Sequence, residues 1–247
     1  MADKSPNIVV FLPGMMCDER LFSFQAERLS HAEQGALHVI IPRLDTATSI
    51  QGLADKILAE TPSRFALCGL SMGGILAMEM VAKAPDRIQG LVLMDTNPLA
   101  ETADGVIRRN RQIEDVKSGR LRQVIADEMK PHYLADSPNK KAHLDLCMDM
   151  ALSLGDEVFI TQSLALRDRP DQTKTLQAVR CPTLILHGRE DRLCPPERHH
   201  LMQELIPHAN LVEIDGAGHL PPLEAPLDTY IHLADFFKKN YSQLFEL

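Results

Sequence analysis

The stretch Gly69-Leu70-Ser71-Met72-Gly73 decides how the rest of this chain is interpreted. It has the pattern Gly-x-Ser-x-Gly, and it lies between an apolar run typical of a buried strand (residues 64–68) and a run typical of a helix (residues 74–83). A serine at such a tight strand-to-helix corner needs glycines nearby, because larger side chains would collide with the strand and the helix. The pattern therefore predicts a nucleophile elbow, in which the hydroxyl of Ser71 is lifted out of a sheet toward the free N–H groups of a helix.

The composition is that of an ordinary globular chain. Its 247 residues are 45% hydrophobic and 24% charged, which fits one large α/β domain or two small ones. The net charge of −8 argues against a nucleic-acid partner. No apolar run approaches the roughly 20 residues that cross a membrane, and no signal-peptide pattern precedes the first strand, so we expect a cytoplasmic protein without membrane association. The sequence does not indicate an oligomeric state.

The five cysteines are scattered along the chain, and no Cys-x-x-Cys pair is present. We therefore expect neither a disulfide framework nor a zinc site, and we interpret the thiols as reduced. Cys68 is expected to face the core from the strand before the elbow.

Strand-like and helix-like segments alternate along most of the chain. Strands are predicted at residues 7–12, 37–41, 64–68, 90–94, 183–187 and 210–214, and helices at residues 20–31, 50–60, 74–83, 197–206 and 226–239. Continuous apolar strands that are joined by helices indicate a mostly parallel, doubly wound sheet with helices on both faces. The predicted fold class is therefore α/β.

The alternation stops between Pro98 and Pro170, where helical patterns occur at residues 120–128 and 141–153 without a convincing strand. We expect residues 1–97 and 171–247 to form the α/β core, and residues 98–170 to be a helical cap, or lid, inserted over the carboxyl ends of the strands. An independent helical domain is the alternative. The sheet needs strands from both sides of the segment, which favours a cap.

A serine hydroxyl becomes a nucleophile only when a base removes its proton and a third group holds that base. In this architecture the residues follow the order serine, acid, histidine. Asp191 follows the strand at 183–187 and His219 follows the strand at 210–214, so both are expected at the sheet edge that carries Ser71. Taken singly, Ser71 suits a turn, Asp191 suits a helix cap and His219 suits an ordinary loop. Their order and positions together predict a catalytic triad.

Asp95 is the competing candidate for the acid. It follows the strand at 90–94, also at the carboxyl edge, and some enzymes of this architecture take their acid from that position. Alternatively, Asp95 fixes the turn into the insertion through its own backbone. We favour Asp191 as the acid.

The oxyanion that forms during acyl transfer needs two N–H donors. The backbone of Met72, directly after the serine, is expected to supply one. Met15 is the best candidate for the other, because Gly14 lets the loop after the first strand turn its next N–H toward the site. Cys17 lies close by and is expected to line the pocket with a structural role, since no base for it is evident.

Other histidines have less catalytic context. We expect His187 to be packed, and His199 and His200 to lie on a surface helix. His132 and His143 belong to the insertion, where solvent exposure is the favoured interpretation and substrate contact the alternative.

Two groups of side chains in the insertion can bear on substrate binding. Arg108, Arg109 and Arg111 form a basic cluster that can bind a carboxylate, although a solvated helix face is the favoured interpretation. An apolar group can line a pocket or pack onto the sheet, and packing is favoured; its members are Leu146, Met148, Met150, Leu152 and Leu154.

Ser71, Asp191 and His219 in these settings resemble the α/β-hydrolase family, and the resemblance covers essentially the whole chain. Residues 69–74, residues 187–191 with Pro195, and residues 216–219 are similar to the corresponding loops of its enol-lactonase and small carboxylesterase branch. The resemblance implies an eight-stranded, mostly parallel sheet with a lid inserted after the sixth strand. It also implies hydrolysis of ester-type bonds without a cofactor or metal.

The chain departs from the family pattern at the oxyanion loop, where many relatives carry His-Gly and this chain has Pro13-Gly14. The backbone donor survives that change, although the identity of the donor is less firmly indicated. The chain also begins close to its first predicted strand, so an N-terminal antiparallel strand can be missing.

The sequence therefore predicts a serine hydrolase that cleaves a carboxylic ester or lactone of a small molecule through an acyl-enzyme. Other activities of the same triad are the alternatives, namely a thioesterase, a carbon–carbon bond hydrolase or a perhydrolase. A ligand-binding protein without catalysis is a further alternative, which an intact triad disfavours.

Overall fold

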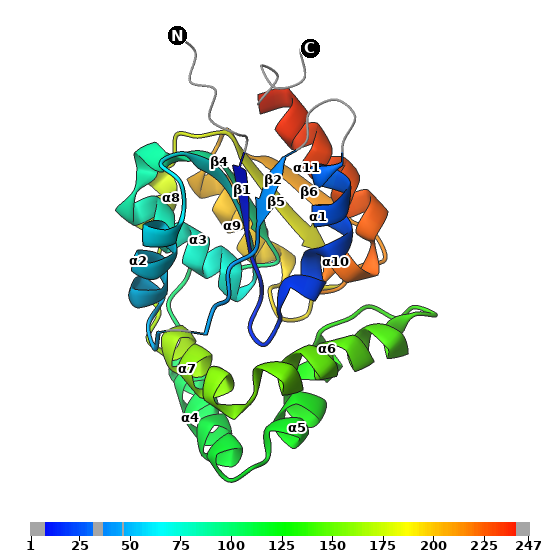
Figure 1. Cartoon of the computed structure of the whole chain (residues 1–247). Coiled ribbons are helices and arrows are strands. Elements are labelled where there is room, and N and C mark those ends of the chain that lie inside the picture. Colours follow the sequence, from blue (N-terminus) through cyan, green and yellow to red (C-terminus); the bar gives the residue numbers. More distant parts are fainter. Residues whose placement is uncertain (1–7, 32–36, 46, 241–247) are drawn as a thin grey trace.

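The computed structural model describes residues 8–31, 37–45 and 47–240, and a parallel sheet lies at its centre (Figure 1). Its six strands are β1 (Ile8–Leu12), β2 (His38–Ile40), β3 (Phe65–Leu70), β4 (Ile88–Met94), β5 (Thr183–Gly188) and β6 (Asn210–Ile214), in the order β2-β1-β3-β4-β5-β6. Every neighbouring pair is parallel. In the register, Gly69 lies opposite both Leu12 and Leu93, so β1, β3 and β4 end close together at one edge.

Helices cover both faces of this sheet. One face carries α2 (Ile50–Glu60), α3 (Met72–Lys83), α8 (Thr173–Ala178) and α9 (Pro196–Leu205), and the other carries α1 (Ser23–Ser30) and α11 (Pro226–Asn240) (Figure 1). The side chains of β1 divide between the two layers, with Val10 and Leu12 in one core cluster and Val9 and Phe11 in the other. Burial on both faces explains why the strands are continuously apolar rather than alternating.

A helical segment separates β4 from β5. It contains α4 (Ala103–Lys117), α5 (Leu121–Val124), a short π-helix (Ile125–Met129), a 3-10 helix (Lys130–His132), α6 (Lys140–Leu154) and α7 (Asp156–Arg167). Figure 1 shows these helices below the carboxyl ends of the strands. Val116, Ile125 and Phe159 form the centre of a small core of their own, which Met148 joins. The other apolar residues considered above also pack into core clusters, namely Leu146, Met150, Leu152 and Leu154.

The structure confirms the predicted α/β class and the positions of the six strands. The predicted bounds of α2 and β6 agree with the structure, whereas β3 extends to Leu70 and α3 begins earlier than predicted, at Met72. The implied number of strands is wrong for the described residues, which form six strands rather than eight. The insertion accordingly follows the fourth strand, not the sixth. Of the predicted strand at 7–12, residue 7 lies outside the described residues.

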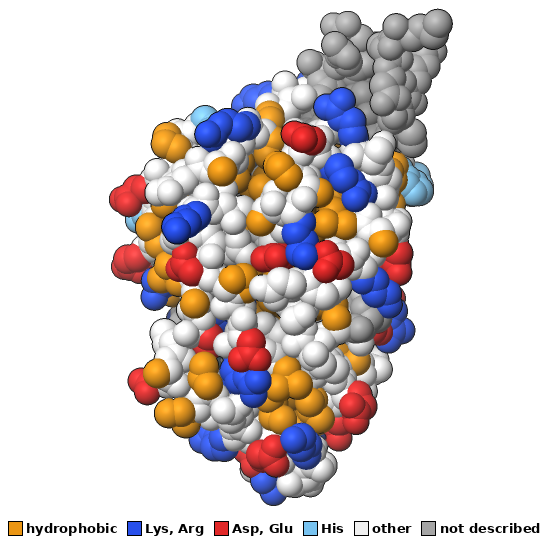
Figure 2. Space-filling model, turned by 90° about the vertical axis from the view of Figure 1, so that its left-hand side faces the viewer, with side chains coloured by type: hydrophobic (Ala, Val, Ile, Leu, Met, Phe, Trp, Pro, Cys, Tyr) orange, Lys and Arg blue, Asp and Glu red, His pale blue; other side chains and the backbone are white. Residues whose placement is uncertain are grey.

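Within the described residues, none of the helices combines the length and the apolar character that a membrane span requires. On the face that Figure 2 shows, acidic and basic side chains are interspersed with hydrophobic ones, and neither sign of charge gathers into a continuous field.

Candidate active site

Ser71 occupies the corner between β3 and α3 in a backbone conformation that side chains rarely adopt, with φ 54° and ψ −115°. Two hydrogen bonds fix this corner. The N–H of Ser71 donates to the carbonyl of Met94 (2.9 Å), and its carbonyl accepts from the hydroxyl of Thr96 (2.7 Å). The strain is therefore held by the end of the neighbouring strand β4 and the residues that follow it.

The two glycines of the elbow are required by close backbone contacts. A Cβ atom on Gly73 would lie 1.9 Å from the carbonyl oxygen of Leu12, and one on Gly69 would lie 2.2 Å from the carbonyl oxygen of Gly73. Any side chain at either position would collide with the main chain. The Gly-x-Ser-x-Gly pattern thus follows from the close approach of β1, β3 and α3 at this edge of the sheet.

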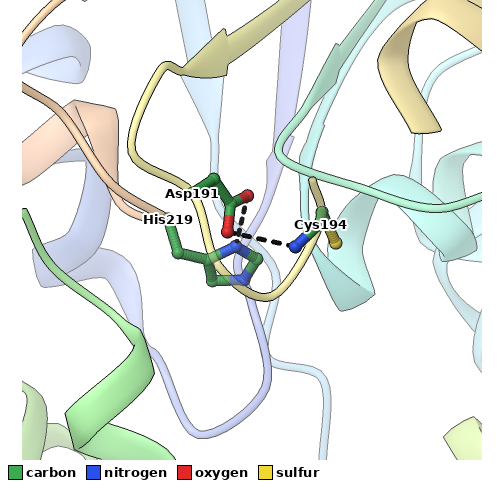
Figure 3. A group of neighbouring side chains, drawn as sticks. All are labelled: Asp191, Cys194 and His219. Atoms are coloured by element: carbon green, nitrogen blue, oxygen red, sulfur yellow. Dashed lines mark hydrogen bonds and ion pairs between the residues drawn. The ribbon is translucent and has the colours of Figure 1, made fainter. Parts of the chain in front are cut away.

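The structure brings Asp191 and His219 together. Asp191 lies in the loop after β5 and His219 in the loop after β6, and His219 Nδ1 is 2.9 Å from Asp191 Oδ2 (Figure 3). The other carboxylate oxygen accepts from the N–H groups of Leu193 (2.8 Å) and Cys194 (3.0 Å). Because an ionised carboxylate only accepts, we assign the proton to Nδ1, which leaves the lone pair of Nε2 available for a proton from elsewhere.

The charge on Asp191 is maintained although its side chain is 0% exposed. Burial alone would raise the pKa of this carboxyl, but His219 and the N–H groups of Cys194 and Leu193 outweigh burial, and the pKa lies below its ordinary value. An ionised Asp191 is what a histidine base needs as its partner.

Asp95 lies near Asp191, but its side chain makes its hydrogen bond to another residue. Its Oδ1 accepts from the N–H of Gly188 (2.9 Å), its Oδ2 is buried without a partner, and its backbone has a positive φ of 44°. Burial, reinforced by the charge of Asp191, raises the pKa of Asp95 well above its ordinary value. Among the described residues, His219 makes its hydrogen bond to Asp191 and makes none to Asp95.

A cavity of about 460 Å³ opens beside the elbow, and Ser71, His219, Met15 and Met72 all line it. Among the hydrogen bonds of the described residues, none joins the Ser71 hydroxyl to His219. Ser71 and His219 thus line one cavity without a direct hydrogen bond between their side chains.

The backbone N–H groups of Met15 and Met72 are both free of protein acceptors within the described part of the chain. The loop that carries Met15 is held in place by its neighbours, because the N–H of Met16 donates to Gln162 (2.9 Å) and the N–H of Cys17 donates to Gly14 (3.1 Å). Two unpaired donors on the lining of one cavity suit an oxyanion, which accepts hydrogen bonds from such groups.

Sequence reasoning missed two residues that support the histidine loop. The N–H of His219 donates to the carbonyl of Tyr133 (2.7 Å), and the two rings stack with centroids 6.3 Å apart. Glu224 accepts from the N–H groups of Leu220 (2.9 Å) and Ala135 (2.8 Å), which ties the insertion to the same loop. Gly218 is the one feature of the sequence that could have indicated this contact between the histidine loop and the insertion. A Cβ atom at that position would lie 2.7 Å from the backbone nitrogen of Ala135.

The histidine predictions are partly confirmed. His187 is buried as predicted, and His200 is exposed. The prediction for His199 is wrong, because α9 turns this ring inward, where it is 0% exposed and stacks on His187 with ring centroids 4.3 Å apart. Burial, followed by the nearby His187, lowers the pKa of His199 to about 3. His132 lines the cavity at its exposed side.

The arginine cluster divides in the structure. Arg108 and Arg109 line the cavity, whereas Arg111 does not. The solvated-face interpretation is wrong for Arg109, whose side chain is only 16% exposed, lines the cavity and pairs with Glu101 (2.7 Å). Helical periodicity gave no indication of this burial, since Arg109 lines a cavity to which residues of both the insertion and the core contribute.

Three possible metal ligands lie near one another, as Figure 3 shows for Asp191, Cys194 and His219. Both oxygens of Asp191 already accept hydrogen bonds, and its Oδ2 holds the imidazole nitrogen that would face an ion. Burial raises the pKa of the Cys194 thiol well above its ordinary value, so the sulfur stays protonated. The donor set thus fits a hydrogen-bonded pair better than a metal centre.

Cys17 lines the cavity, and burial raises its thiol pKa in the same way, which fits the structural role predicted for it.

Comparisons with known proteins agree with the fold. Residues 53–226 match the model of the α/β-hydrolase fold family. A pimeloyl-[acyl-carrier protein] methyl ester esterase from Aromatoleum aromaticum is 25% identical over 209 residues, which cover 76% of this chain and 79% of that protein. A thermophilic esterase from Thermogutta terrifontis, described with malate bound, has a TM-score of 0.87 and 29% identity over 96% of this chain and 91% of that one.

An enol-lactonase from Burkholderia xenovorans LB400 shares the fold, with a TM-score of 0.82 and 18% identity over 96% of this chain and 94% of that one. The resemblance first noted in the three loops is thus confirmed at the level of the family.

Proposed function

The chain belongs to the α/β-hydrolase fold family, and from this premise we propose that it is a serine hydrolase that cleaves a carboxylic ester or lactone of a small molecule. The observation that carries the proposal is that Ser71, at its strained corner, and His219, held by Asp191, line one cavity. The names of similar proteins, which include esterases, support an ester over a thioester or a carbon–carbon bond.

In the proposed reaction, Nε2 of His219 takes the proton of the Ser71 hydroxyl while the oxygen attacks the carbonyl carbon of the ester. Asp191 holds the imidazole in the required tautomer and stabilises the imidazolium that forms. The tetrahedral intermediate collapses as His219 passes the proton to the leaving alcohol oxygen, and the acyl group stays on Ser71. Water then attacks this acyl-enzyme with the same histidine as base, which releases the acid and restores the serine.

The N–H groups of Met72 and Met15 are proposed to bind the oxyanion. Each would donate one hydrogen bond to an oxygen that gains charge in the transition state, and the loss of one such donor typically costs about 3 kcal/mol of transition-state stabilisation. A helix N-terminus behind Met72 adds to the same field.

We further propose that the insertion, residues 98–170, acts as a cap. Its residues Arg109, Gln112 and Tyr133 line the cavity together with Ser71 from the core, so the space for substrate lies between the two. The backbone contact from His219 to Tyr133 would make cap position and histidine position depend on each other.

The direct test is turnover of a panel of p-nitrophenyl esters and lactones by the wild type and by Ser71→Ala. We expect ester hydrolysis that Ser71→Ala abolishes, with an unchanged unfolding temperature. Trapping of a phosphonate on Ser71, seen as a mass increase of the intact protein, would support the acyl-enzyme route. Acyl-thioester turnover far above that of oxygen esters would contradict the proposal, as would ester hydrolysis that persists in Ser71→Ala.

A further inference from the structure

The cavity lining carries more positive than negative charge, in a chain whose net charge is −8. Four arginines line it against two glutamates: Arg108, Arg109, Arg169, Arg192, Glu101 and Glu128. Figure 2 shows no comparable excess of one sign on the outer face it presents.

Both glutamates are already neutralised by arginines. Glu101 pairs with Arg109 (2.7 Å) and Arg169 (2.9 Å), and its side chain is only 7% exposed. Glu128 pairs with Arg111, which lies outside the lining. Arg108 and Arg192 have no ion pair among the described residues. The lining therefore carries positive charge that its own glutamates do not neutralise.

Within the buried group, Arg169 is fully engaged and Arg109 is not. Arg169 donates to the carbonyls of Leu99 (2.9 Å) and Leu166 (3.3 Å) as well as to Glu101. Arg109 uses only Nε for Glu101, and its Nη1 lies 3.8 Å from the sulfur of Met15, a weak acceptor. Its Nη2 has no partner among the described residues. Arg109 and Arg169 therefore share one buried anion, the carboxylate of Glu101. The Nη1 and Nη2 side of the Arg109 guanidinium, called its open edge here, has no strong acceptor, and Arg109 lines the cavity.

The position of that open edge matters for the reaction. Met15, which the Arg109 guanidinium touches, belongs to the loop that presents a free N–H to the same cavity. Burial lowers the pKa of Arg109 more than Glu101 restores it, so the guanidinium lacks part of the compensation that a buried cation needs. An anion beside Arg109 would supply it, through a two-pronged hydrogen-bonded pair of the kind that guanidinium forms with carboxylate.

We propose that the open edge of Arg109, with Arg108 on its exposed side, binds a carboxylate on the substrate, so that this enzyme prefers half-esters or lactones of dicarboxylic acids to neutral esters. The inference rests on the proposed function. The carboxylate can belong to the acyl part or to the alcohol part of the ester, and both share the chemistry that Arg109 recognises.

The test compares esters of equal length with and without a carboxylate. Monomethyl glutarate and monomethyl adipate place the carboxylate in the acyl part, acetyl esters of hydroxy acids place it in the alcohol part, and methyl valerate and methyl hexanoate are neutral counterparts. Hydrolysis is followed by proton release for the wild type, Arg109→Gln, Arg109→Lys and the control Arg122→Gln, an exposed residue of α5 that does not line the cavity.

We expect the wild type to prefer at least one class of carboxylate-bearing ester. In Arg109→Gln, kcat/KM for that ester should fall by about 10- to 100-fold, the range expected when a hydrogen bond to a charged group is lost. The loss should appear mainly in KM and leave the neutral ester little changed. Arg109→Lys should restore part of the preference, and Arg122→Gln should keep all of it.

Equal or better turnover of the neutral esters by the wild type would overturn the inference while leaving the proposed function intact. So would a preference that survives in Arg109→Gln. If Arg109→Gln fails to fold, the wild-type comparison still decides. If no ester is hydrolysed at all, calorimetric titration of glutarate into the wild type tests the subsite independently, and the absence of binding would refute it.

Discussion

A carboxylate oxygen of Asp95 and one of Asp191 lie within 4.8 Å of one another, yet among the described residues only Asp191 makes a hydrogen bond to His219. Two carboxyl groups this close do not both ionise readily. Asp191 keeps its charge, because the imidazole and two N–H groups favour the ionised form. Burial and the charge of Asp191 raise the pKa of Asp95 well above its ordinary value, so Asp95 is the carboxyl of the two that takes up a proton more readily, and its Oδ1 accepts from the N–H of Gly188.

The two aspartates should therefore respond differently to the same substitution. Asp191→Asn removes the charge and the acceptor that fix the histidine tautomer, and we expect kcat to fall by about 10⁴-fold. Asp95→Asn preserves an acceptor for Gly188 and resembles the protonated acid, so it should lower kcat only weakly. Steady-state kinetics on one ester, with circular dichroism to verify folding, checks both. The reverse ranking would make Asp95 the acid of the triad.

Much of this site was predictable because it depends on local rules. The elbow follows from glycine sterics, and the shared position of Ser71, Asp191 and His219 follows from the strands β3, β5 and β6, each of which one of these residues follows. Parallel strands bring their carboxyl ends to one edge, so three loops far apart in the sequence were expected to meet.

The contacts that were not predicted join the insertion to the core across long sequence separations. No periodicity indicates that Tyr133 accepts from His219, or that Glu101 holds two arginines. The burial of Arg109 depends on how the insertion sits over the sheet, which a helical pattern does not encode. His199 was misplaced for a related reason, since the inward face of a short helix is decided by tertiary packing.

The elbow glycines make a prediction about stability. Gly73→Ala places a methyl group against the carbonyl of Leu12, at 1.9 Å, and neither main chain can move without breaking the sheet edge. We expect a loss of unfolding free energy on the order of 3 kcal/mol or more, at the upper end for single substitutions. Urea unfolding provides the measurement.

The matched control is Gly52→Ala, in α2. There the added methyl meets only side-chain atoms, of Ala47 and Ser49, at 3.1 Å. Small adjustments can relieve that contact, and alanine favours a helix over glycine, so the unfolding free energy should change by no more than about 1 kcal/mol. Equal effects of the two substitutions would show that the elbow tolerates a side chain.

The buried group around Glu101 predicts a pH dependence of stability. Burial opposes ionisation of this carboxyl, but Arg109 and Arg169 outweigh burial, and its pKa in the folded protein lies below the ordinary value of 4.5. A lowered folded-state pKa stabilises the fold above the unfolded-state pKa, and that stabilisation is lost as the pH falls through the folded-state pKa. Removing one partner of a buried ion pair typically costs about 3–5 kcal/mol. Glu101→Gln should therefore lower the unfolding free energy by about that much at pH 7, measured by urea unfolding.

The same substitution should matter less in acid, because the wild-type carboxyl then also becomes neutral. We expect the difference in unfolding free energy between wild type and Glu101→Gln to be constant above about pH 5 and to shrink as the pH falls below the ordinary value of 4.5. Glu114→Gln is the control, since this residue is exposed on α4 and pairs only with Lys117, and it should change stability little at any pH. A difference for Glu101→Gln that grows toward low pH would mean that the two arginines do not stabilise an ionised Glu101 in the folded protein.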